Sequence, residues 1–268
     1  MSDLSWKLSV FASRWRNRFH YVARAPFVYR NWWAMLLSKV GVSVVLELRN
    51  GLRYLVRSGT TDLAVVNETF LSNSSYLTGF GNLPEDADVM DVGANIGSFS
   101  MLLARACPRG RVFAVEPVSE HHDMIEVQKL LNKAVHVTNL HLALGDHEGE
   151  IDIHVEGSSS SAFWGHGKVE KVRLTTLPRL MEELKIDQLA LLKLDCEGAE
   201  WSILPAAEDV LPRIQRIAME FHCMQGWTAE KLASWLRERG YEVRHTSGPW
   251  NGHLWASRAP FIAPVENY

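Results

Sequence analysis

Residues 89–97 read VMDVGANIG, and this stretch decides how the rest of the chain is interpreted. The apolar run VMDV is typical of a buried strand, and SFSMLLARA, which follows the stretch, is typical of a helix. Glycines in the turn between them let the backbone pass close to a ligand, and the start of the helix directs unpaired N–H groups at any anionic part of it. The stretch therefore predicts a ligand-binding turn between a strand and a helix.

The spacing of the glycines indicates the kind of ligand. A dinucleotide-binding turn follows the pattern G-x-G-x-x-G, in which the second glycine makes room for a pyrophosphate. Here Ala94 and Asn95 follow Gly93, and the next glycine is Gly97. The turn therefore suits a ligand with a carboxylate and no pyrophosphate better than it suits NAD.

Two acidic residues stand at the ends of the first two predicted strands of this region. Asp91 lies where a dinucleotide would bring its phosphates, but its charge suits an ammonium group. Glu116 ends the run RVFAVE, about 20 residues downstream, where an acidic side chain binds the ribose hydroxyls of a nucleoside. Together the two acids predict a ligand in which an amino acid is joined to a nucleoside. Taken singly, Asp91 could instead cap the helix that starts at Ser98, and Glu116 could be merely solvated.

From Pro84 onward, strand and helix patterns alternate, which predicts a doubly wound, Rossmann-like α/β sheet, mostly parallel and covered on both faces. We expect a hairpin-like excursion around residues 157–167 and an antiparallel edge formed by YEVRHT and HLWAS near the end of the chain. The predicted strands are VMDV, RVFAVE, VHVTNLHLAL, LALLKLD and RIQRIAMEF, and the predicted helices are SFSMLLARA, SEHHDMIEVQKLLN, PRLMEELK and WTAEKLASWLRERG.

The amino-terminal region differs from the rest. Residues 1–40 hold seven Lys or Arg, one acid and nine aromatic residues, and their apolar side chains recur at helical spacing between Leu4 and Val22. This segment could pack on its own domain or on a twin subunit, or lie on an anionic membrane surface. Two apolar runs then flank Asn50-Gly51, a dipeptide that accepts positive φ at both turn positions, and DLAVVNETFL reads as a helix. We expect an appendage of helices and a β-hairpin over residues 1–82 and the main domain over residues 83–268.

Composition excludes several classes of protein. A chain of 268 residues, 47% of them hydrophobic, can bury a full core, and 28 Lys and Arg against 31 Asp and Glu leave no field that favours nucleic acid. The three cysteines, Cys107, Cys196 and Cys223, are far apart and lack metal-ligand spacing, which argues against a disulfide framework or a structural zinc site. Without a spanning apolar stretch or a signal peptide, the expected location is the cytoplasm.

Several short runs in order resemble the motif set of the FkbM family of S-adenosylmethionine-dependent methyltransferases. They are VMDVGANIGSFS, AVEP, ALGD, the TTL before a helix, LLKLDCEGAEWSIL and MEFH, and the resemblance covers roughly residues 50–225. It implies a class I methyltransferase sheet, S-adenosylmethionine as cofactor, and O-methylation of a hydroxyl on a sugar, polysaccharide or secondary metabolite.

The resemblance also implies roles for individual residues. The glycine turn and its two acids would bind the cofactor through Asp91, Gly93, Ala94, Asn95, Gly97 and Glu116. The chain around Ala143 and Leu144, in the third predicted strand, would lie against the adenine. Glu68 and Tyr76 match family positions that close over the cofactor.

Methyl transfer is an in-line displacement, so the protein must align the donor with the acceptor oxygen and help to remove its proton. Asp195 ends the run LLKLD, beside the methionine end of the cofactor, and is expected to orient the acceptor or the base. Glu220 and His222 lie two apart in MEFH and share a face. We expect His222 to be the general base, because an unperturbed histidine pKa of ~6.5 leaves the ring mostly neutral near pH 7.

Other roles are open for these residues. Asp195 could cap the helix containing Gly198-Ala199-Glu200, His222 could be non-catalytic, and Lys193 is either structural or paired with one of these acids. A divalent cation held by Asp195, Glu197, Glu200 and His222 is a further alternative, although spacing along a helix does not establish that the side chains converge, so no metal is predicted.

One loop is a candidate for substrate contact. Phe163, Trp164 and His166 lie among glycines and serines in residues 157–167, which could form a lid over sugar rings or a disordered connector. The predicted partner is a small-molecule or glycan hydroxyl acceptor and not a nucleic acid. The alternative functions are a nicotinamide-dependent oxidoreductase and a non-catalytic binding module.

Overall fold

The structure is a computed structural model that describes residue 21 and residues 23–71, 76–77, 79–156, 159–161, 168–222, 228–246 and 251–262. The chain forms two compact units, Met1–Ser75 and Tyr76–Tyr268. Residues 79–82, at the start of the second unit, contact its far end, because Phe80 stacks on Phe261 with 5.6 Å between ring centroids and the amide of Ile262 donates to the carbonyl of Gly79.

The first unit contains the predicted β-hairpin. Strands β1 (Val44–Glu47) and β2 (Arg53–Val56) pair antiparallel, with Glu47 opposite Arg53. The turn is wider than the two residues that the Asn50-Gly51 pair suggested: Leu48 and Leu52 still pair, and only Gly51 has a positive φ, of 93°. A three-residue turn that ends in a left-handed residue is the next common way to close a hairpin.

Helices complete the first unit. Residues 23–28 are helical, and α2 (Ala34–Lys39) and α3 (Asp62–Leu71) follow. The Tyr29 hydroxyl donates to Asn67 of α3 over 2.9 Å, and both Tyr29 and Tyr54 are fully buried. Asp62 begins α3 and pairs with Arg57 over 2.8 Å, which ties the helix to the end of the hairpin.

The second unit is built on a seven-stranded sheet with the order β12-β13-β11-β10-β3-β4-β5. Its strands are β3 (Val89–Val92), β4 (Val112–Val115), β5 (Val137–Leu140), β10 (Leu191–Leu194), β11 (Arg216–His222), β12 (Glu242–His245) and β13 (Asn251–Ser257). All neighbours are parallel except that β13 runs antiparallel to both β11 and β12. The predicted doubly wound fold is confirmed, with the antiparallel strand one place in from the edge.

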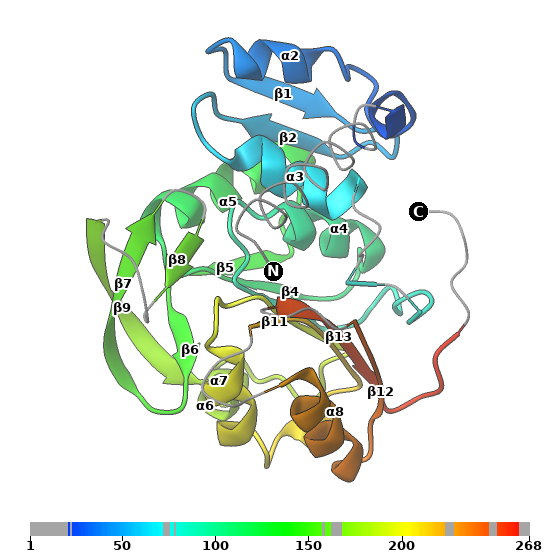
Figure 1. The fold of residues 1–268 in the computed structure, drawn as a ribbon, viewed down its shortest axis with the longest axis vertical. Coiled ribbons are helices and arrows are strands. Elements are labelled where there is room, and N and C mark those ends of the chain that lie inside the picture. The colour runs from blue at the N-terminus through cyan, green and yellow to red at the C-terminus, as the bar shows by residue number, and fades with distance from the viewer. Residues whose placement is uncertain are drawn as a thin grey trace, which may run out of the picture. The chain divides into compact units, whose positions relative to one another are not determined.

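Helices cover both faces of the sheet, as Figure 1 shows. On one face lie α4 (Ser98–Ala106) and α5 (Ser119–Asn132), and on the other lie α6 (Leu177–Glu183), α7 (Glu200–Ala206) and α8 (Ala229–Glu238). Threonine side chains cap the amino-terminal ends of two of these helices. Thr176 accepts a hydrogen bond from the amide of Arg179 in α6, and Thr228 accepts one from the amide of Lys231 in α8.

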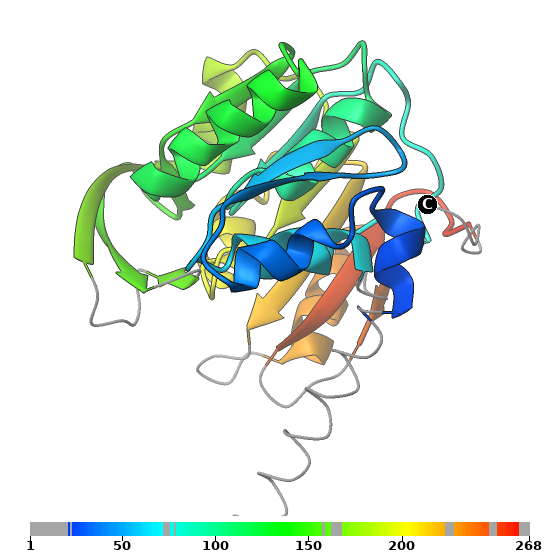
Figure 2. The same ribbon diagram turned by 90° about the horizontal axis from the view of Figure 1, so that it is seen from above.

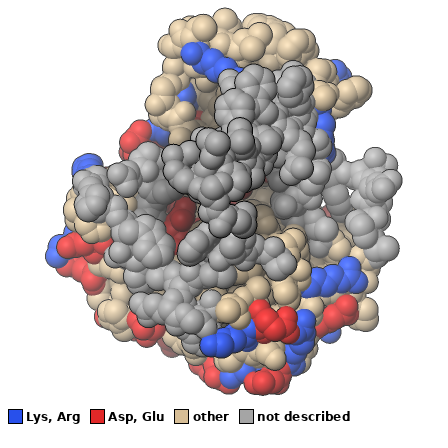
Figure 3. Space-filling view, in the orientation of Figure 1, with Lys and Arg blue, Asp and Glu red and all other residues tan. Residues whose placement is uncertain are grey.

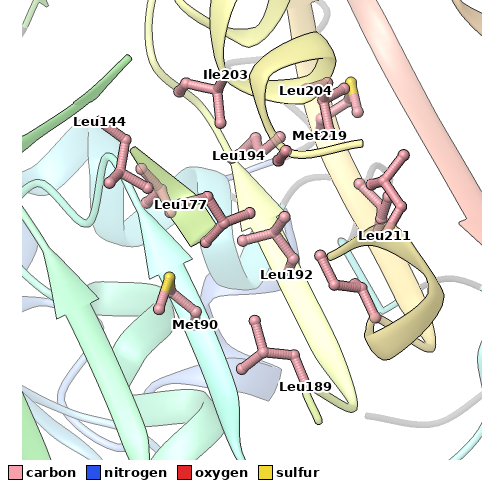
Figure 4. Close-up of a cluster of buried hydrophobic side chains, with 14 of the residues drawn as sticks. Met90, Leu144, Leu177, Leu189, Leu192, Leu194, Ile203, Leu204, Leu211 and Met219 are labelled. Atoms are coloured by element: carbon pink, nitrogen blue, oxygen red, sulfur yellow. The ribbon is translucent and has the colours of Figure 1, made fainter. Parts of the chain in front are cut away.

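The largest core lies between the sheet and helices α6 to α8. Figure 4 shows Met90, Leu192 and Leu194 of the strands among the leucines of these helices, and all of them are buried. Because side chains alternate along a strand, Asp91 and Lys193 point to the opposite face, toward α4. The apolar side of the sheet thus anchors the strands whose polar residues form the site.

A smaller, four-stranded sheet is formed by the part of the chain between β5 and β10. The run VHVTNLHLAL, expected to be one strand, is two: β5 stays in the main sheet, and β6 (Ala143–Gly145) pairs with β9 (Lys168–Thr176). Strands β9 and β7 (Gly149–Glu156) form a long antiparallel pair with the short β8 (Ser159–Ser161) beside β7, and the pair extends from one side of the second unit in Figure 2.

Candidate functional site

The strand order reverses beside β3, which makes this point of the sheet the natural place for a ligand. β3 pairs with β4 on one side and with β10 on the other, and the helices that follow β3 and β10 cover opposite faces. In open α/β sheets, ligands bind outside the carboxyl ends of the strands where the order reverses. The residues that follow β3, β4 and β10 therefore form the candidate site.

The glycine turn after β3 is built so tightly that a side chain cannot enter it. Gly93 has a φ of 72°, and a Cβ atom there would lie 1.8 Å from the carbonyl oxygen of Asp195. Gly97, with a φ of 80°, is the residue before α4 and, as a glycine, provides no side chain to cap the helix. The turn thus passes directly over the end of β10 and leads into the start of α4.

Glu116 ties the glycine turn to the end of β4. Its Oε2 atom accepts the Asn95 amide over 2.7 Å, and its Oε1 atom accepts the Val118 amide over 2.9 Å. The side chain is nearly fully buried, and His121 lies 3.6 Å away. Asn95 itself has a positive φ of 51°, and its side chain accepts the next amide, that of Ile96. Glu116 is therefore a buried carboxylate with a fixed orientation.

Ala143 and Leu144, the predicted adenine neighbours, lie on β6. Both are nearly buried, and they stand opposite Leu174 and Thr175 of β9. They provide apolar surface at the beginning of the second sheet, after the end of β5.

Asp91 pairs with a lysine inside the protein. It is fully buried; Lys193 Nζ lies 3.0 Å from its Oδ1 atom, and Ser100 donates to its Oδ2 atom over 2.6 Å. Lys193 also donates to the carbonyl of Gly93 over 2.8 Å and lies 3.7 Å from Asp195. The sequence predicted a ligand ammonium group beside Asp91, but the ammonium group there is that of Lys193. We call Asp91, Lys193 and Asp195 the lysine cluster.

The charge of Lys193 is stabilised by the two acids. Burial lowers the pKa of Lys193, but the charges of Asp91 and Asp195 outweigh burial and raise it above its ordinary value. Lys193 therefore pairs with nearby acids, and through its bond to the carbonyl of Gly93 it also links β10 to the glycine turn, so both roles considered for it apply.

Asp195 is the more accessible acid of the lysine cluster. About a third of its side chain, 31%, is exposed, and its Oδ2 atom accepts the Tyr76 hydroxyl over 3.0 Å. The Tyr76 ring lies 5.2 Å from that of Phe99 and 5.3 Å from Lys193 Nζ. Tyr76 therefore lies over the same face of the sheet as the cluster.

A second cluster of one cation and two acids lies at the end of β11. His222 has its Nε2 atom 3.4 Å from Glu197 and its Nδ1 atom 3.5 Å from Glu200. Burial lowers the pKa of His222, but contact with Glu200, followed by the charges of Glu197 and Glu220, raises it to about 9. We call Glu197, Glu200 and His222 the histidine cluster.

The raised pKa corrects the argument for His222 as a general base. That argument required a neutral ring near pH 7, whereas a ring with a pKa of about 9 holds its proton there. A protonated imidazole donates hydrogen bonds and cannot accept a proton. Glu197 and Glu200, which both lie against His222, thus favour the protonated ring over the expected neutral one, and a catalytic role for His222 stays a prediction.

Glu200, and not Asp195, closes the turn between β10 and α7. Its carboxylate is fully buried and accepts the amides of Cys196 and Gly198 over 2.8 and 3.1 Å. Glu197, between them, has a positive φ of 52°. In the ranges that the structure describes, the acids and histidines nowhere form a group that could hold a metal ion. The cation alternative for Asp195, Glu197, Glu200 and His222 therefore has no support.

His253 on β13 is a polar residue that the sequence argument missed. Its ring centroid lies 5.8 Å from those of Tyr76 and Trp255. Burial lowers its pKa, with the charge of Asp195 opposing that effect. It stands opposite Glu220 of β11. Because β13 runs antiparallel, its first residues lie at the carboxyl edge of the sheet, and this signal is visible only once the strand order is known.

Some predicted residues lie elsewhere. Glu68 is exposed on α3 in the first unit. Phe163, Trp164 and His166 of the predicted lid lie outside the described residues, as do Cys223 and the helical stripe from Leu4 to Phe19. None of the helices in the described ranges has the length and apolar character needed to cross a lipid bilayer.

Comparison with known proteins agrees with the class of protein that the fold and the site define, a doubly wound α/β methyltransferase. The model of the methyltransferase FkbM domain matches residues 91–243, which is more than half of the chain. The chain belongs to the FkbM methyltransferase family. The match begins at Asp91 and includes the glycine turn and both clusters.

Two curated proteins are similar over about 60% of the chain. The AMB antimetabolite synthetase AmbE of Pseudomonas aeruginosa is 29% identical in an alignment of 207 positions that covers 60% of this chain and 10% of that protein. The methyltransferase sdnD of Sordaria araneosa is 24% identical in an alignment of 206 positions that covers 63% of this chain and 79% of that protein. The chain thus spans about a tenth of the first relative and most of the second.

Solved structures with a related arrangement include a methyltransferase FkbM from Methylobacillus flagellatus, 16% identical, with a TM-score of 0.47 over 68% of this chain and 47% of that one. TYW2 of M. jannaschii in complex with AdoMet is 14% identical, with a TM-score of 0.43 over 80% of this chain and 84% of that one.

Proposed function

We propose that the protein is an S-adenosylmethionine-dependent methyltransferase that acts on a hydroxyl group of a sugar, polysaccharide or secondary metabolite. The observation that carries the proposal is the glycine turn at the reversal of strand order, where Gly93 lies directly against Asp195 and Asn95 is bound by Glu116, within the part of the chain that matches the FkbM family. Such a turn admits a ligand against bare backbone, with an acid on each side of it.

The polar groups of the site fit the cofactor. A carboxylate has about four acceptor positions, and two backbone amides occupy part of those of Glu116, which leaves room for ribose hydroxyls. Asp195, partly exposed, would face the ammonium group of the methionine end. Asp91 is buried and would contribute indirectly, because it pairs with Lys193, which lies between the two acids. The start of α4, with its N–H groups at the end of the glycine turn, suits the methionine carboxylate, and Ala143 with Leu144 suits the adenine.

Each part of the chain would then have a distinct task. The bound cofactor supplies an electrophilic methyl group on a positively charged sulfur. The buried net negative charge of the lysine cluster holds the cationic end, and the tightness of the turn fixes its position relative to the ends of β10 and β11. The acceptor would lie over the ends of β10, β11 and β13, on the side of the site away from Glu116.

The acceptor class rests on the family resemblance and on the name of one relative, an antimetabolite synthetase, which supports small secondary metabolites as the first acceptors to try. The proposed partner is a hydroxyl-bearing small molecule or glycan and not a nucleic acid, in line with the near balance of charges.

Ligand protection tests the proposal. S-adenosylhomocysteine should raise the melting temperature of the purified protein in proportion to the logarithm of its concentration, whereas NAD should not. Protection by NAD alone would favour the nicotinamide-dependent alternative. Incubation with isotopically labelled S-adenosylmethionine and fractionated metabolites, glycans and lipids, followed by mass spectrometry, would then identify the acceptor.

A further inference from the structure

We propose that His253 is the residue that accepts the hydroxyl proton of the acceptor, and that Asp195 and Tyr76 position it. The inference rests on the proposed function and names the base of the same site. Three observations support it: the position of His253 at the carboxyl edge, its surroundings, and the state of the other histidine at this edge.

The position follows from strand direction. His253 stands opposite Glu220, near the carboxyl end of β11, and β11 lies next to β10, which ends at Asp195. Side chains at alternate positions share a face, so Lys193, Trp255 and His253 belong to the face that Tyr76 covers. His253 is therefore on the acceptor side of the strand reversal.

The surroundings hold the ring without occupying its nitrogens. The His253 ring stacks on Trp255 with an interplanar angle of 16° and lies against Tyr76, whose hydroxyl donates to Asp195. In the part of the chain that the structure describes, neither ring nitrogen takes part in a hydrogen bond. A half-buried imidazole with its ring held in place and its nitrogens unoccupied suits proton transfer to an incoming ligand.

Among the described residues, charged groups near His253 lie on two strands, β10 and β11. Asp195 lies at the end of β10, Glu220 on β11 accepts from the side chain of Asn251, and Lys193 lies behind the Tyr76 ring. Burial lowers the pKa of His253 despite the charge of Asp195, so the ring is neutral at pH 7, in contrast to His222. Of these two histidines, His253 is the one able to accept a proton.

A ring nitrogen of His253 takes the acceptor proton, the oxygen lone pair forms the new bond to the methyl carbon, and the electron pair of the broken carbon–sulfur bond remains on sulfur. The imidazolium then returns its proton to solvent. Asp195 and Tyr76 act as positioning residues in this scheme.

The first test needs no acceptor. In the NMR titration of the free protein with labelled histidine, His253 should titrate below 6.5 and His222 well above it, and His253→Gln identifies the resonance. S-adenosylhomocysteine should bind His253→Gln with the wild-type affinity by calorimetry. A His253 ring that stays protonated above pH 7 would overturn the inference.

The second test measures label transferred from S-adenosylmethionine to a mixed extract of metabolites, glycans and lipids. His253→Gln should reduce the rate at least about 100-fold and His222→Gln by much less. Equal rates in wild type and His253→Gln would overturn the inference alone. Failure of the wild type to bind S-adenosylhomocysteine would overturn the proposed function, and the inference with it.

A separate observation in the first unit supports a second inference. The segment from Phe27 to Val45 exposes an unusual amount of apolar surface, including Phe27 at 80%, Trp33 at 54%, Leu36 at 58% and Val40 at 74%. In Figure 3 the surface over α2 is mostly tan with blue Lys and Arg side chains on it. We call the exposed side chains of Phe27, Trp32, Trp33, Leu36, Leu37, Val40, Val42 and Val45 the apolar patch.

The charges around the apolar patch favour one partner. Arg30, Lys39 and Arg49 are exposed beside it, and the sequence holds no Asp or Glu from residue 4 to residue 46. Exposed tryptophan on an apolar surface with cations beside it is typical of a segment that lies on an anionic membrane, because apolar burial and the attraction of the cations to anionic lipid both favour binding. We infer that the apolar patch binds the surface of an anionic bilayer.

Vesicle sedimentation tests this inference. Vesicles of phosphatidylcholine mixed with phosphatidylserine should sediment the protein, vesicles of phosphatidylcholine alone much less, and added salt should weaken binding. Trp32→Ser with Trp33→Ser should reduce binding about tenfold or more, and the control Leu130→Ser with Val135→Ser, at 80% and 92% exposure in the second unit, should not. Absence of binding, or a dimer in light scattering that the tryptophan variant dissociates, would overturn the inference.

Discussion

The lysine cluster and the histidine cluster follow the same plan with different cations. Each places one cation between two carboxylates at the end of a strand of the same sheet, and each carries a net charge of −1 when the cation is protonated. In the lysine cluster the two acids outweigh the effect of burial and keep the cation charged at every physiological pH, whereas in the histidine cluster the charge is lost as pH rises past about 9. The lysine cluster therefore stabilises the cofactor side of the site at any physiological pH, whereas the histidine cluster stabilises the turn before α7 only while His222 is protonated.

The strongest test of the comparison removes the permanent cation. Lys193→Met leaves the carboxylate of Asp91 buried and unpaired, so the free energy of unfolding should fall by about 3–5 kcal/mol in urea denaturation. Asp91→Asn in the same chain should restore more than half of the loss, because the double variant no longer buries an isolated charge. A loss below about 1 kcal/mol in the single variant would show that Asp91 does not depend on the lysine.

The second test follows the histidine cluster with pH. The folded pKa of His222, about 9, exceeds the unfolded value of about 6.5, so its stabilisation is complete below about pH 6.5 and lost as pH rises through about 9. The shift corresponds to at most about 3 kcal/mol. The free energy of unfolding should therefore fall over this window in the wild type, and fall less in His222→Gln. Parallel curves for the two proteins would contradict the raised pKa.

A matched pair of glycines tests how closely the lysine cluster is packed. Gly93 and Gly59 have nearly the same φ, 72° and 75°, but only Gly93 has no room for a Cβ atom. Gly59→Ala should cost about 1–2 kcal/mol from the left-handed backbone alone, and Gly93→Ala should cost about 1–3 kcal/mol more from overpacking. If thermal denaturation shows the same loss of stability for both variants, the backbone at Asp195 must be able to move away and make room for the Cβ atom.

The smallest expected effect belongs to Glu200. Glu200→Gln keeps the shape but weakens the bonds from the amides of Cys196 and Gly198, which should cost about 1–2 kcal/mol. Removal of its charge should also lower the pKa of His222 toward its ordinary value in an NMR titration. An unchanged His222 pKa would leave Glu197 as its main partner.

Much of the fold could be predicted because apolar periodicity is strong in the second unit. The helix Ser98–Ala106 and the strand Val89–Val92 coincide with their sequence patterns. The division of VHVTNLHLAL into β5 and β6 could not be predicted, since both halves are apolar and only pairing with β9 separates them. The helix expected around Gly198-Ala199-Glu200 is α7, which begins at Glu200 and contains Pro205.

The site was predictable as a set of residues but not as a set of contacts. The glycines and acids of the turn lie where strand and helix patterns meet, so their neighbourhood follows from the fold. Which acid binds Lys193 depends on the register between β3 and β10, which places it opposite Asp91. The protonation of His222 depends likewise on a turn that brings Glu197 and Glu200 against it.

Calorimetric titration of S-adenosylhomocysteine into wild type, Glu116→Gln and the control Glu238→Gln, an exposed acid on α8, tests the central claim most directly. The account predicts binding by wild type and by the control, with at least about tenfold weaker binding by a folded Glu116→Gln, because hydrogen bonds to a charged group contribute about 1.5–3 kcal/mol. Absence of binding by wild type, or equal affinity in all three proteins, would contradict it.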